Sequence, residues 1–429
     1  MVQASSWADT SITGMHSGTK TPHPLKQRCG DYCIQYPHNL RIIIAYAEII
    51  GYYPITKCGD YIVYSWENAD WPTFRRSSEK LETLLKSVHH AQGRLLGRME
   101  ALGFQQRNEA HLQTLTQDVL KTSEIEGENL DYEQVRSSIA QRLGIDAGGF
   151  VTADRNVDAI VEVMLDATNN YLSPVTSERL FGWHSCLFPT GRSGMTKINV
   201  GHYRTDEAGP MQVVSGPVGR EKVHYQAPPA NRLEQEMTHF LAWLESNEEN
   251  DPILKAAIAH LWFVTIHPFD DGNGRIGRAI ADLCLARADQ TSQRFYSMSK
   301  QIREERNAYY DILEHTQKSG LDITDWLEWF LNCLLRAIQG AGGTLDSILS
   351  KAQFWEKLGG TPLNERQVKI LNKLFDGFEG KLTTTKWAKL AKCSQDTAYR
   401  DIMDLIEKGV LEKLPEGGRS TNYWLANTP

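Results

Sequence analysis

Residues 267–278, HPFDDGNGRIGR, decide the fold of this chain. An apolar run at 253–266 leads into this stretch, and a second run with helical spacing follows it at 276–288. Because the residue before a proline is pushed out of the α region, Pro268 predicts that the first helix ends at His267. The stretch is therefore expected to be the loop of a helix–loop–helix.

The loop has the residue types of an anion-binding site. Gly272 and Gly274 permit a tight turn that brings successive backbone N–H groups together. The free N–H groups and the positive dipole end of the next helix face the same place. Arg275 and Arg278 are three residues apart, so they share a helix face. These features predict a phosphate cradle with the imidazole of His267 at its edge. The alternative is a structural turn with a buried histidine and surface arginines.

The same stretch resembles the signature of Fic-domain proteins, His-Pro-Phe-x-Asp/Glu-Gly-Asn-Gly-Arg-x-x-Arg, and it matches each fixed position. The resemblance implies a mainly α fold, namely a Fic-type helical bundle with a β-hairpin flap. It further implies a protein adenylyltransferase, an enzyme that moves AMP from ATP to a Ser, Thr or Tyr hydroxyl of a target protein and releases pyrophosphate.

The resemblance also assigns roles to residues of the loop. His267 would be the general base, and an imidazole suits that task near neutral pH. Asp271 would hold Mg²⁺. Asp270 fills a variable position and receives no role. The remaining positions would bind the phosphates of ATP, with the last of them orienting the γ-phosphate: Gly272, Asn273, Gly274, Arg275 and Arg278.

A second stretch, residues 122–127 (TSEIEG), ends an upstream helical run. Taken alone, Gly127 is a helix C-cap and Glu126 a solvated acid in the last turn. The stretch resembles the inhibitory motif of Fic proteins, Ser/Thr-x-x-x-Glu-Gly/Asn. The resemblance implies that Glu126 pairs with Arg278 and keeps the enzyme autoinhibited. In some family members this glutamate also supports the reverse reaction, so removal of AMP from targets (de-AMPylation) stays open.

Two short β-prone runs, 211–215 and 222–226, flank a Gly-Pro-Val-Gly turn and predict a hairpin. It is either an exposed hairpin without a role or, by the Fic resemblance, the flap. In the flap, an edge strand can pair with an extended segment of the target protein. Ser215 and Gly216 would then be among the residues nearest the nucleotide.

The chain is expected to contain four parts. Residues 1–60 lack a sustained period and are interpreted as an appended or poorly ordered segment. Residues 61–150, which open with an expected aromatic strand at 61–72, form an N-terminal helical region that carries the inhibitory helix. Residues 151–345 form the Fic catalytic domain, and residues 361–429 form a winged-helix domain.

Residues 361–429 are assigned to a winged helix because three helical patterns precede two short strands. DNA binding needs a basic face, and the third helix carries Arg400 among several acids. Lys386, Lys389, Lys392 and Arg419 could contact backbone phosphate. DNA binding and a role in recognising a protein partner both stay open.

Composition places few further limits. The net charge of −7 gives no global attraction to nucleic acid or anionic membrane. Seven scattered cysteines fit a reducing compartment, and we expect a cytoplasmic protein without a membrane span. The resemblance to bacterial Fic proteins implies a bacterial protein. By resemblance we also expect self-modification and a homodimer. Two other functions remain as alternatives, a Fic-fold phosphotransferase with another donor and a winged-helix DNA-binding regulator.

Overall fold

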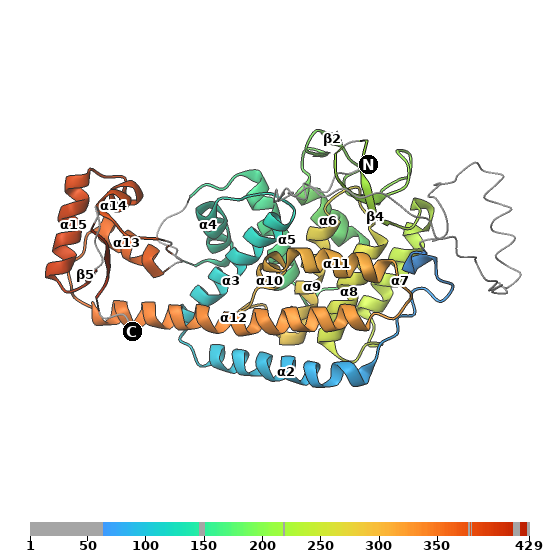
Figure 1. Cartoon of the computed structure of the whole chain (residues 1–429), viewed down its shortest axis with the longest axis horizontal. Coiled ribbons are helices and arrows are strands. Elements are labelled where there is room, and N and C mark those ends of the chain that lie inside the picture. The colour runs from blue at the N-terminus through green and yellow to red at the C-terminus, as the bar shows by residue number, and fades with distance from the viewer. Residues whose placement is uncertain are drawn as a thin grey trace, which may run out of the picture. The chain divides into compact units, whose positions relative to one another are not determined.

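The computed structural model describes residues 63–145, 151–217, 219–375, 378, 380–414 and 421–426. The segment expected at 1–60 lies outside these ranges. The described residues are mainly helical, which confirms the predicted mainly α fold, while the winged helix stays a prediction (Figure 1). In order along the chain up to residue 357, their α-helices are α2 (Ser78–Glu100), α3 (Phe104–Ile125), α4 (Tyr132–Leu143), α5 (Arg155–Asn169), α6 (Ser177–Leu187), α7 (Leu233–Glu245), α8 (Pro252–Ile266), α9 (Asn273–Asp289), α10 (Met298–Glu304), α11 (Arg306–Gln317) and α12 (Thr324–Lys357).

Helices α8 and α9 pack against each other at the centre of the bundle. α8 is buried along its whole length from Ile253 to Ile266, because its sequence is apolar on every face. Gly277 lets α9 approach closely, since a Cβ there would lie 2.8 Å from Cγ1 of Val264. His260 of α8 is buried and contacts the Gly277 carbonyl and the Tyr309 hydroxyl.

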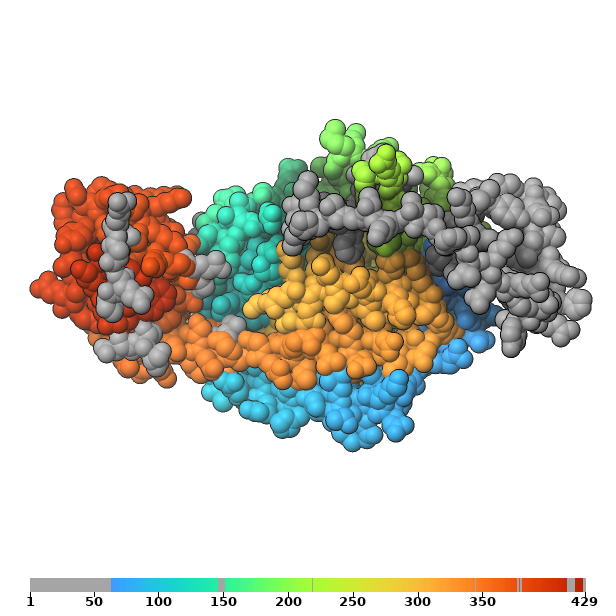
Figure 2. All heavy atoms as spheres, in the orientation of Figure 1, coloured from blue at the N-terminus to red at the C-terminus, as the bar shows by residue number. Residues whose placement is uncertain are grey.

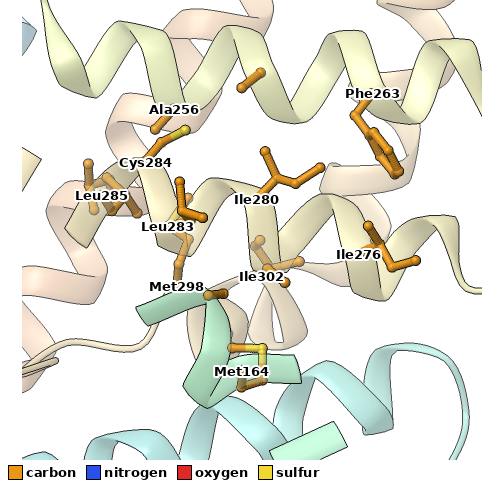
Figure 3. Packing of buried hydrophobic residues seen from close by; sticks show 14 of the residues in the cluster. Met164, Ala256, Phe263, Ile276, Ile280, Leu283, Cys284, Leu285, Met298 and Ile302 are labelled. Atoms are coloured by element: carbon orange, nitrogen blue, oxygen red, sulfur yellow. The ribbon is translucent and has the colours of Figure 1, made fainter. Parts of the chain in front are cut away.

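Other helices complete the core around this pair. In Figure 3, α9, with Ile276, Ile280 and Leu283, lies between α8, which carries Ala256 and Phe263, and side chains of α5 and α10, which close the same core. α3, which carries Glu126 at its C-terminal end, packs on α10 and α12. α2 lies alongside α12 on one face of the molecule (Figure 2).

The strands of the described residues form three separate two-stranded sheets. β3 (Gln212–Ser215) and β4 (Lys222–Gln226) form the predicted hairpin. Val213 pairs with Tyr225 and Val214 with Val223, so His224 is an extra residue in the ladder, a β-bulge. The other sheets are β1 (Arg192–Ser193) with β2 (Thr196–Lys197), and β5 (Leu411–Lys413) with β6 (Tyr423–Leu425).

The prediction of a strand at 61–72 is wrong for the residues of this range that the structure describes, which begin at Val63. This part contains the 3₁₀ helix η1 (Ser65–Glu67) and no strand. The aromatic residues are used for packing instead of a ladder. Trp66 is buried beside Tyr225 and donates its ring N–H to the carbonyl of Gln226, 2.8 Å away. A second 3₁₀ helix, η2 (Ala230–Arg232), precedes α7.

The C-terminal part contains the three predicted helices, α13 (Glu365–Phe375), α14 (Thr384–Ala391) and α15 (Gln395–Glu407), and the strands β5 and β6. Its buried side chains form a hydrophobic cluster of their own. α12 continues without a break past residue 345, the predicted end of the catalytic domain, to Lys357. Residues 415–420, between β5 and β6, lie outside the described ranges. The division into domains stays a prediction.

Candidate active site

The loop between α8 and α9 is built by two residues with left-handed backbone conformations. His267 caps α8 at φ 53°, ψ 58°, and Gly272 precedes α9 at φ 82°. The side chain of Asn273 turns back into the loop, where it accepts from the N–H of Phe269 (3.0 Å) and donates to its carbonyl (2.8 Å). Asn273 therefore holds the loop closed, and its amide group faces inward.

His267 has a defined tautomer and a neutral ring. Its Nδ1 lies 3.2 Å from the carbonyl of Val264, which requires Nδ1 to carry the proton and leaves the lone pair on Nε2. Burial lowers the pKa of His267 to about 4, the charge of Arg204 acts in the same direction, and Asp271 and Glu126 oppose it. The imidazole is therefore in its base form at neutral pH.

The two acids of the loop have different partners. Asp270 accepts from the N–H of Asn199 (2.7 Å) and so anchors a neighbouring segment. Asp271 accepts from the N–H of Gly272 (2.6 Å) and from the hydroxyl of Ser193 in β1. The described residues contain no cluster of three metal-ligating side chains. A single carboxylate still fits Mg²⁺, which proteins commonly hold through one or two carboxylates together with substrate phosphates.

Arg275 lies in the first turn of α9. Its guanidinium is buried over the ring of Phe188, 5.1 Å from the ring centre, and 3.3 Å from Glu128. Within the described part of the chain its Nε has no hydrogen-bond partner. A buried cation with an unused donor at a helix N-terminus is well suited to bind an anion.

Arg278, one turn further along α9, is held by the end of α3. Its Nε donates to the hydroxyl of Thr122 (2.7 Å) and its Nη2 to the carboxylate of Glu126 (2.7 Å). The guanidinium is buried, while the side chain of Glu126 is 31% exposed. Burial alone would raise the pKa of Glu126, but the charges of Arg278 and Arg275 outweigh it and lower the pKa.

Gly274 has a role that differs from the predicted one. We expected it to turn the loop, but α9 already begins at Asn273, so Gly274 lies inside the first helical turn. Its value is its lack of a side chain, because a Cβ would overlap Oε1 of Glu126 and lie 3.2 Å from Nη1 of Arg278. The carboxylate of Glu126 thus lies against the N-terminal turn of α9.

The β3–β4 hairpin is fixed to the site by hydrogen bonds from β4. Tyr225 donates its hydroxyl to the carbonyl of Thr265 near the end of α8 (2.7 Å). The bulge residue His224 lies between Ser215 Oγ (2.6 Å from Nε2) and Glu314 of α11 (2.5 Å from Nδ1). Gly216 has φ 100°, a conformation that favours glycine. Ser215 is therefore already bonded within the hairpin.

Among the residues named for DNA contact, the structure describes Lys386, Lys389 and Lys392. Lys386 lies 4.3 Å from the ring centre of Phe378. On α15, Asp401 forms an ion pair with Arg366 (2.8 Å), while Tyr399 is half exposed. Arg419 lies outside the described residues. DNA binding by this part stays a prediction.

Comparison with known proteins agrees with the geometry of the loop. Residues 174–285, which include the whole 267–278 stretch, match the Fic/DOC family. The chain carries a Fic/DOC domain. Residues 64–145, which include Thr122 and Glu126, match a separate family described as a domain of unknown function, DUF4172.

Curated relatives of the Fic/DOC domain bear the name protein adenylyltransferase Fic. One from Aedes aegypti is 26% identical over 232 residues, which are 53% of this chain and 42% of the relative. One from Nematostella vectensis is 35% identical over 116 residues, 26% of this chain and 25% of the relative. The chain thus spans less than half the length of these two relatives.

Solved structures with similarity include a Fic family protein from Desulfovibrio desulfuricans G20. It is 21% identical, with a TM-score of 0.47, and the match covers 81% of this chain and 97% of that one. A Fic domain containing signalling protein from Bacteroides thetaiotaomicron is 18% identical, with a TM-score of 0.43, over 60% and 96% of the two chains.

Three residues beside the Fic/DOC loop carry no sequence signal that we used. Ser193 contacts Asp271, Glu314 orients His224, and Arg204 donates to the carbonyl of His267. Each lies far from its partner in sequence, so spacing could not reveal it.

None of the helices in the described ranges combines the length and apolar character needed to cross a bilayer.

Proposed function

We propose that this chain is an autoinhibited protein adenylyltransferase, which transfers AMP from ATP to a hydroxyl side chain of a target protein and releases pyrophosphate. The observation that carries the proposal is the position of two buried arginines, Arg275 and Arg278, at the start of the helix that follows a neutral His267. The similarity to proteins named protein adenylyltransferase supports the same reaction class.

In the proposed reaction, His267 is the general base. Its Nε2 lone pair takes the proton of the target hydroxyl as the hydroxyl oxygen attacks the α-phosphorus. The bond from the α-phosphorus to the bridging oxygen breaks, and pyrophosphate leaves. Because Nδ1 is bonded to the Val264 carbonyl, the ring presents Nε2 without having to change its tautomer.

The rest of the loop binds and orients the nucleotide. The N–H groups at the start of α9 and the guanidinium of Arg275 receive the phosphates near the attacked phosphorus. Arg278 receives the γ-phosphate. Asp271 would hold Mg²⁺ against the phosphates, and the bound ion would offset charge on the leaving pyrophosphate. Positioning and electrostatics then supply most of the rate.

The proposed inhibition is a competition between the carboxylate of Glu126 and a phosphate of ATP for Arg278. Glu126 occupies Nη2 of Arg278 and lies against Gly274, so one carboxylate takes two contacts that a phosphate needs. A hydrogen bond to a charged group contributes about 1.5–3 kcal/mol. Removing the carboxylate should therefore raise transfer by about tenfold or more.

The proposal is tested with wild type, Glu126→Ala and His267→Ala, each given Mg²⁺ and ATP labelled at the α- or the γ-phosphate, with and without lysate. Glu124→Ala is the matched control, because Glu124 lies in the same last turn and pairs with Lys121 instead of Arg278. We expect label on protein from α-labelled ATP alone, strong in Glu126→Ala, absent in His267→Ala, and at the wild-type level in Glu124→Ala.

Other outcomes would redirect the assignment. Label from the γ-position would make the chain a Fic-fold phosphotransferase. Loss of AMP from a target that already carries it would make de-AMPylation the main activity. No label from either position in Glu126→Ala, with ATP still bound, would refute transfer.

A further inference from the structure

The backbone of His267 is held in a conformation that it would not adopt unaided. A non-glycine residue with φ 53°, ψ 58° is in the left-handed region, which costs roughly 1–2 kcal/mol. His267 also ends α8, whose last carbonyls have no partner within the helix. Both facts require something outside the helix to fix this residue.

Arg204 supplies that fixation from a segment 63 residues earlier in the chain. Its Nε donates to the carbonyl of His267 (2.8 Å), and its backbone N–H donates to the carbonyl of Pro268 (2.9 Å). One residue thus binds the two successive carbonyls that set the direction of the chain after α8. A cation there also suits the negative end of the α8 dipole.

The other end of the guanidinium is anchored just as firmly. Its Nη2 donates to the carbonyl of Pro228, just after β4 (2.5 Å), and its Nη1 donates to Asp206 (3.0 Å). Asp206 in turn accepts from the N–H of Ala230 (2.6 Å). The side chain of Arg204 has no exposed surface, so solvent does not weaken these contacts. The guanidinium of Arg204 therefore links the exit of the hairpin to the backbone of His267. Its contacts with His267, Asp206 and Pro228 are called the Arg204 fork below.

We propose that Arg204 is a positioning residue for His267, which holds the imidazole at the reacting phosphorus and ties it to the base of the β3–β4 hairpin. The inference rests on the proposed transfer reaction and extends it. Displacing a catalytic group by about 1 Å can cost a hundredfold in rate. Loss of the fork is therefore expected to lower kcat and to leave the KM for ATP nearly unchanged. The proposed phosphate contacts come from the start of α9, including Arg275 and Arg278, and not from Arg204.

Arg204 has a second effect on His267, through its charge. Burial lowers the pKa of His267, and the guanidinium lowers it further, against the opposing charges of Asp271 on the loop and Glu126 at the end of α3. Arg204→Gln removes the charge and most of the fork. Arg204→Lys keeps the charge but cannot reach both His267 and Pro228 with one planar group.

The experiment compares Arg204→Gln, Arg204→Lys and Asp206→Asn, each in the Glu126→Ala background. Arg179→Gln is the matched control, because Arg179 also forms several hydrogen bonds, to Asp166 and nearby carbonyls, but none to the loop. The measurements are kcat and KM for ATP across pH, NMR titration of the His267 imidazole, and amide exchange of residues 267–272.

We expect both Arg204 variants to lose about tenfold to a hundredfold in kcat, with faster exchange at 267–272. The His267 pKa should rise from its value of about 4 in Arg204→Gln and stay low in Arg204→Lys. Asp206→Asn, which only loosens the fork, should fall between wild type and Arg204→Lys. Arg179→Gln should change none of these.

An unchanged kcat and unchanged exchange in folded Arg204→Gln would overturn the inference. If that variant does not fold, Asp206→Asn and Arg204→Lys decide the question in the same way. The titration and the exchange need no turnover. A chain that transfers no AMP but still shows both responses would therefore refute the proposed function, while the contact between Arg204 and His267 would stand.

Discussion

At the scale of single residues, the contact that most constrains the site is the one between Arg278 and the end of α3. A buried guanidinium needs all its donors satisfied, and Thr122 and Glu126 supply its partners from α3. Glu126 is the more accessible of the two, and Thr122 is completely buried. Thr122 therefore holds the arginine in place whether or not Glu126 is bound.

Thr122→Val tests this division of roles. Valine has nearly the shape of threonine, so the change removes the hydroxyl and leaves Nε of Arg278 without its acceptor. We expect the free energy of unfolding to fall by about 1–3 kcal/mol. Thr116→Val is the control, because Thr116 is equally buried on α3 but its hydroxyl bonds only to the Leu112 carbonyl of its own helix. Denaturant titration of both variants makes the comparison, and equal losses would contradict the role given to Thr122.

Sequence reasoning named candidate reactive residues but did not identify the residues that hold them in place. The 267–278 pattern pointed to His267 and Arg278 because their types and spacing are local. Arg204 contacts His267 across 63 residues, and no local period encodes that contact. The need for a glycine at position 274 also could not be read from the local sequence, because the side chain of Glu126 occupies the space that a Cβ would take.

At the scale of elements, the β3–β4 hairpin is fixed by its bulge. The extra residue in β4 directs His224 toward Glu314 of α11, while Tyr225 bonds to α8. Burial would raise the pKa of Glu314, but hydrogen bonds from Lys318 and His224 outweigh it and lower the pKa. The bond to His224 is therefore accepted by an ionised carboxylate, which makes it stronger than a neutral one.

His224→Ala should loosen the hairpin. Loss of a hydrogen bond to a charged acceptor is expected to cost about 1.5–3 kcal/mol locally, which speeds amide exchange at 212–217 and 222–226 by about tenfold or more. His239→Ala, on the exposed face of α7, is the control and should leave the exchange of the hairpin unchanged. Equal exchange in wild type and His224→Ala would show that the other contacts of β4, at Tyr225 and Gln226, fix the hairpin without His224.

The predicted helices and strands agree with the structure where the sequence pattern is strong. The two central helices and the hairpin were predicted to within a few residues, because α8 is apolar throughout and the two β-prone runs of the hairpin flank a Gly-Pro-Val-Gly turn. α10 and the β1–β2 pair were not anticipated, since each is short, and α4 was missed because its 12 residues carry few large apolar side chains. At Val63–Pro72, aromatic residues suggested a strand, but tertiary packing of Trp66 decided the outcome.

At the scale of the whole molecule, a buried network of charges joins α3 to α9. Arg294 forms an ion pair with Asp289 (2.6 Å) and approaches Asp282 (3.4 Å), and both acids lie on α9. Asp118 of α3 accepts from the hydroxyl of Ser297 (2.5 Å). Burial raises the pKa of Asp118 well above its ordinary value, the charge of Asp282 adds to the rise, and Arg294 opposes it. The folded protein therefore keeps a proton that the unfolded chain releases.

This proton makes stability depend on pH in a direction opposite to that of most acids. The contribution of Asp118 is complete below its unfolded pKa, about 4, and is lost as the pH rises through the raised folded pKa. Asp118→Asn cannot ionise, so its stability relative to wild type should improve as the pH rises from about 4. Thermal or denaturant unfolding between acidic and neutral pH measures the trend.

Asp158→Asn is the matched control with the opposite sign. A hydrogen bond from Ser138, together with the bond and charge of Arg142, lowers the pKa of Asp158, so this acid stabilises the fold at pH values above its unfolded pKa. Its asparagine variant should lose stability relative to wild type as the pH rises through the lowered folded pKa to about 4, and the difference should stay constant above that pH. Parallel trends in the two variants would contradict the protonated state assigned to Asp118.

The pairing of Glu126 with Arg278 joins two parts of one chain. An intramolecular group competes at an effective concentration fixed by the fold, so dilution does not weaken it. Raising or lowering the amount of protein leaves the proportion of paired molecules unchanged. The pair responds to the concentration of an anionic competitor and to anything that moves the end of α3. A signal that acts on this site therefore works by supplying an anionic competitor for Arg278 or by moving the end of α3.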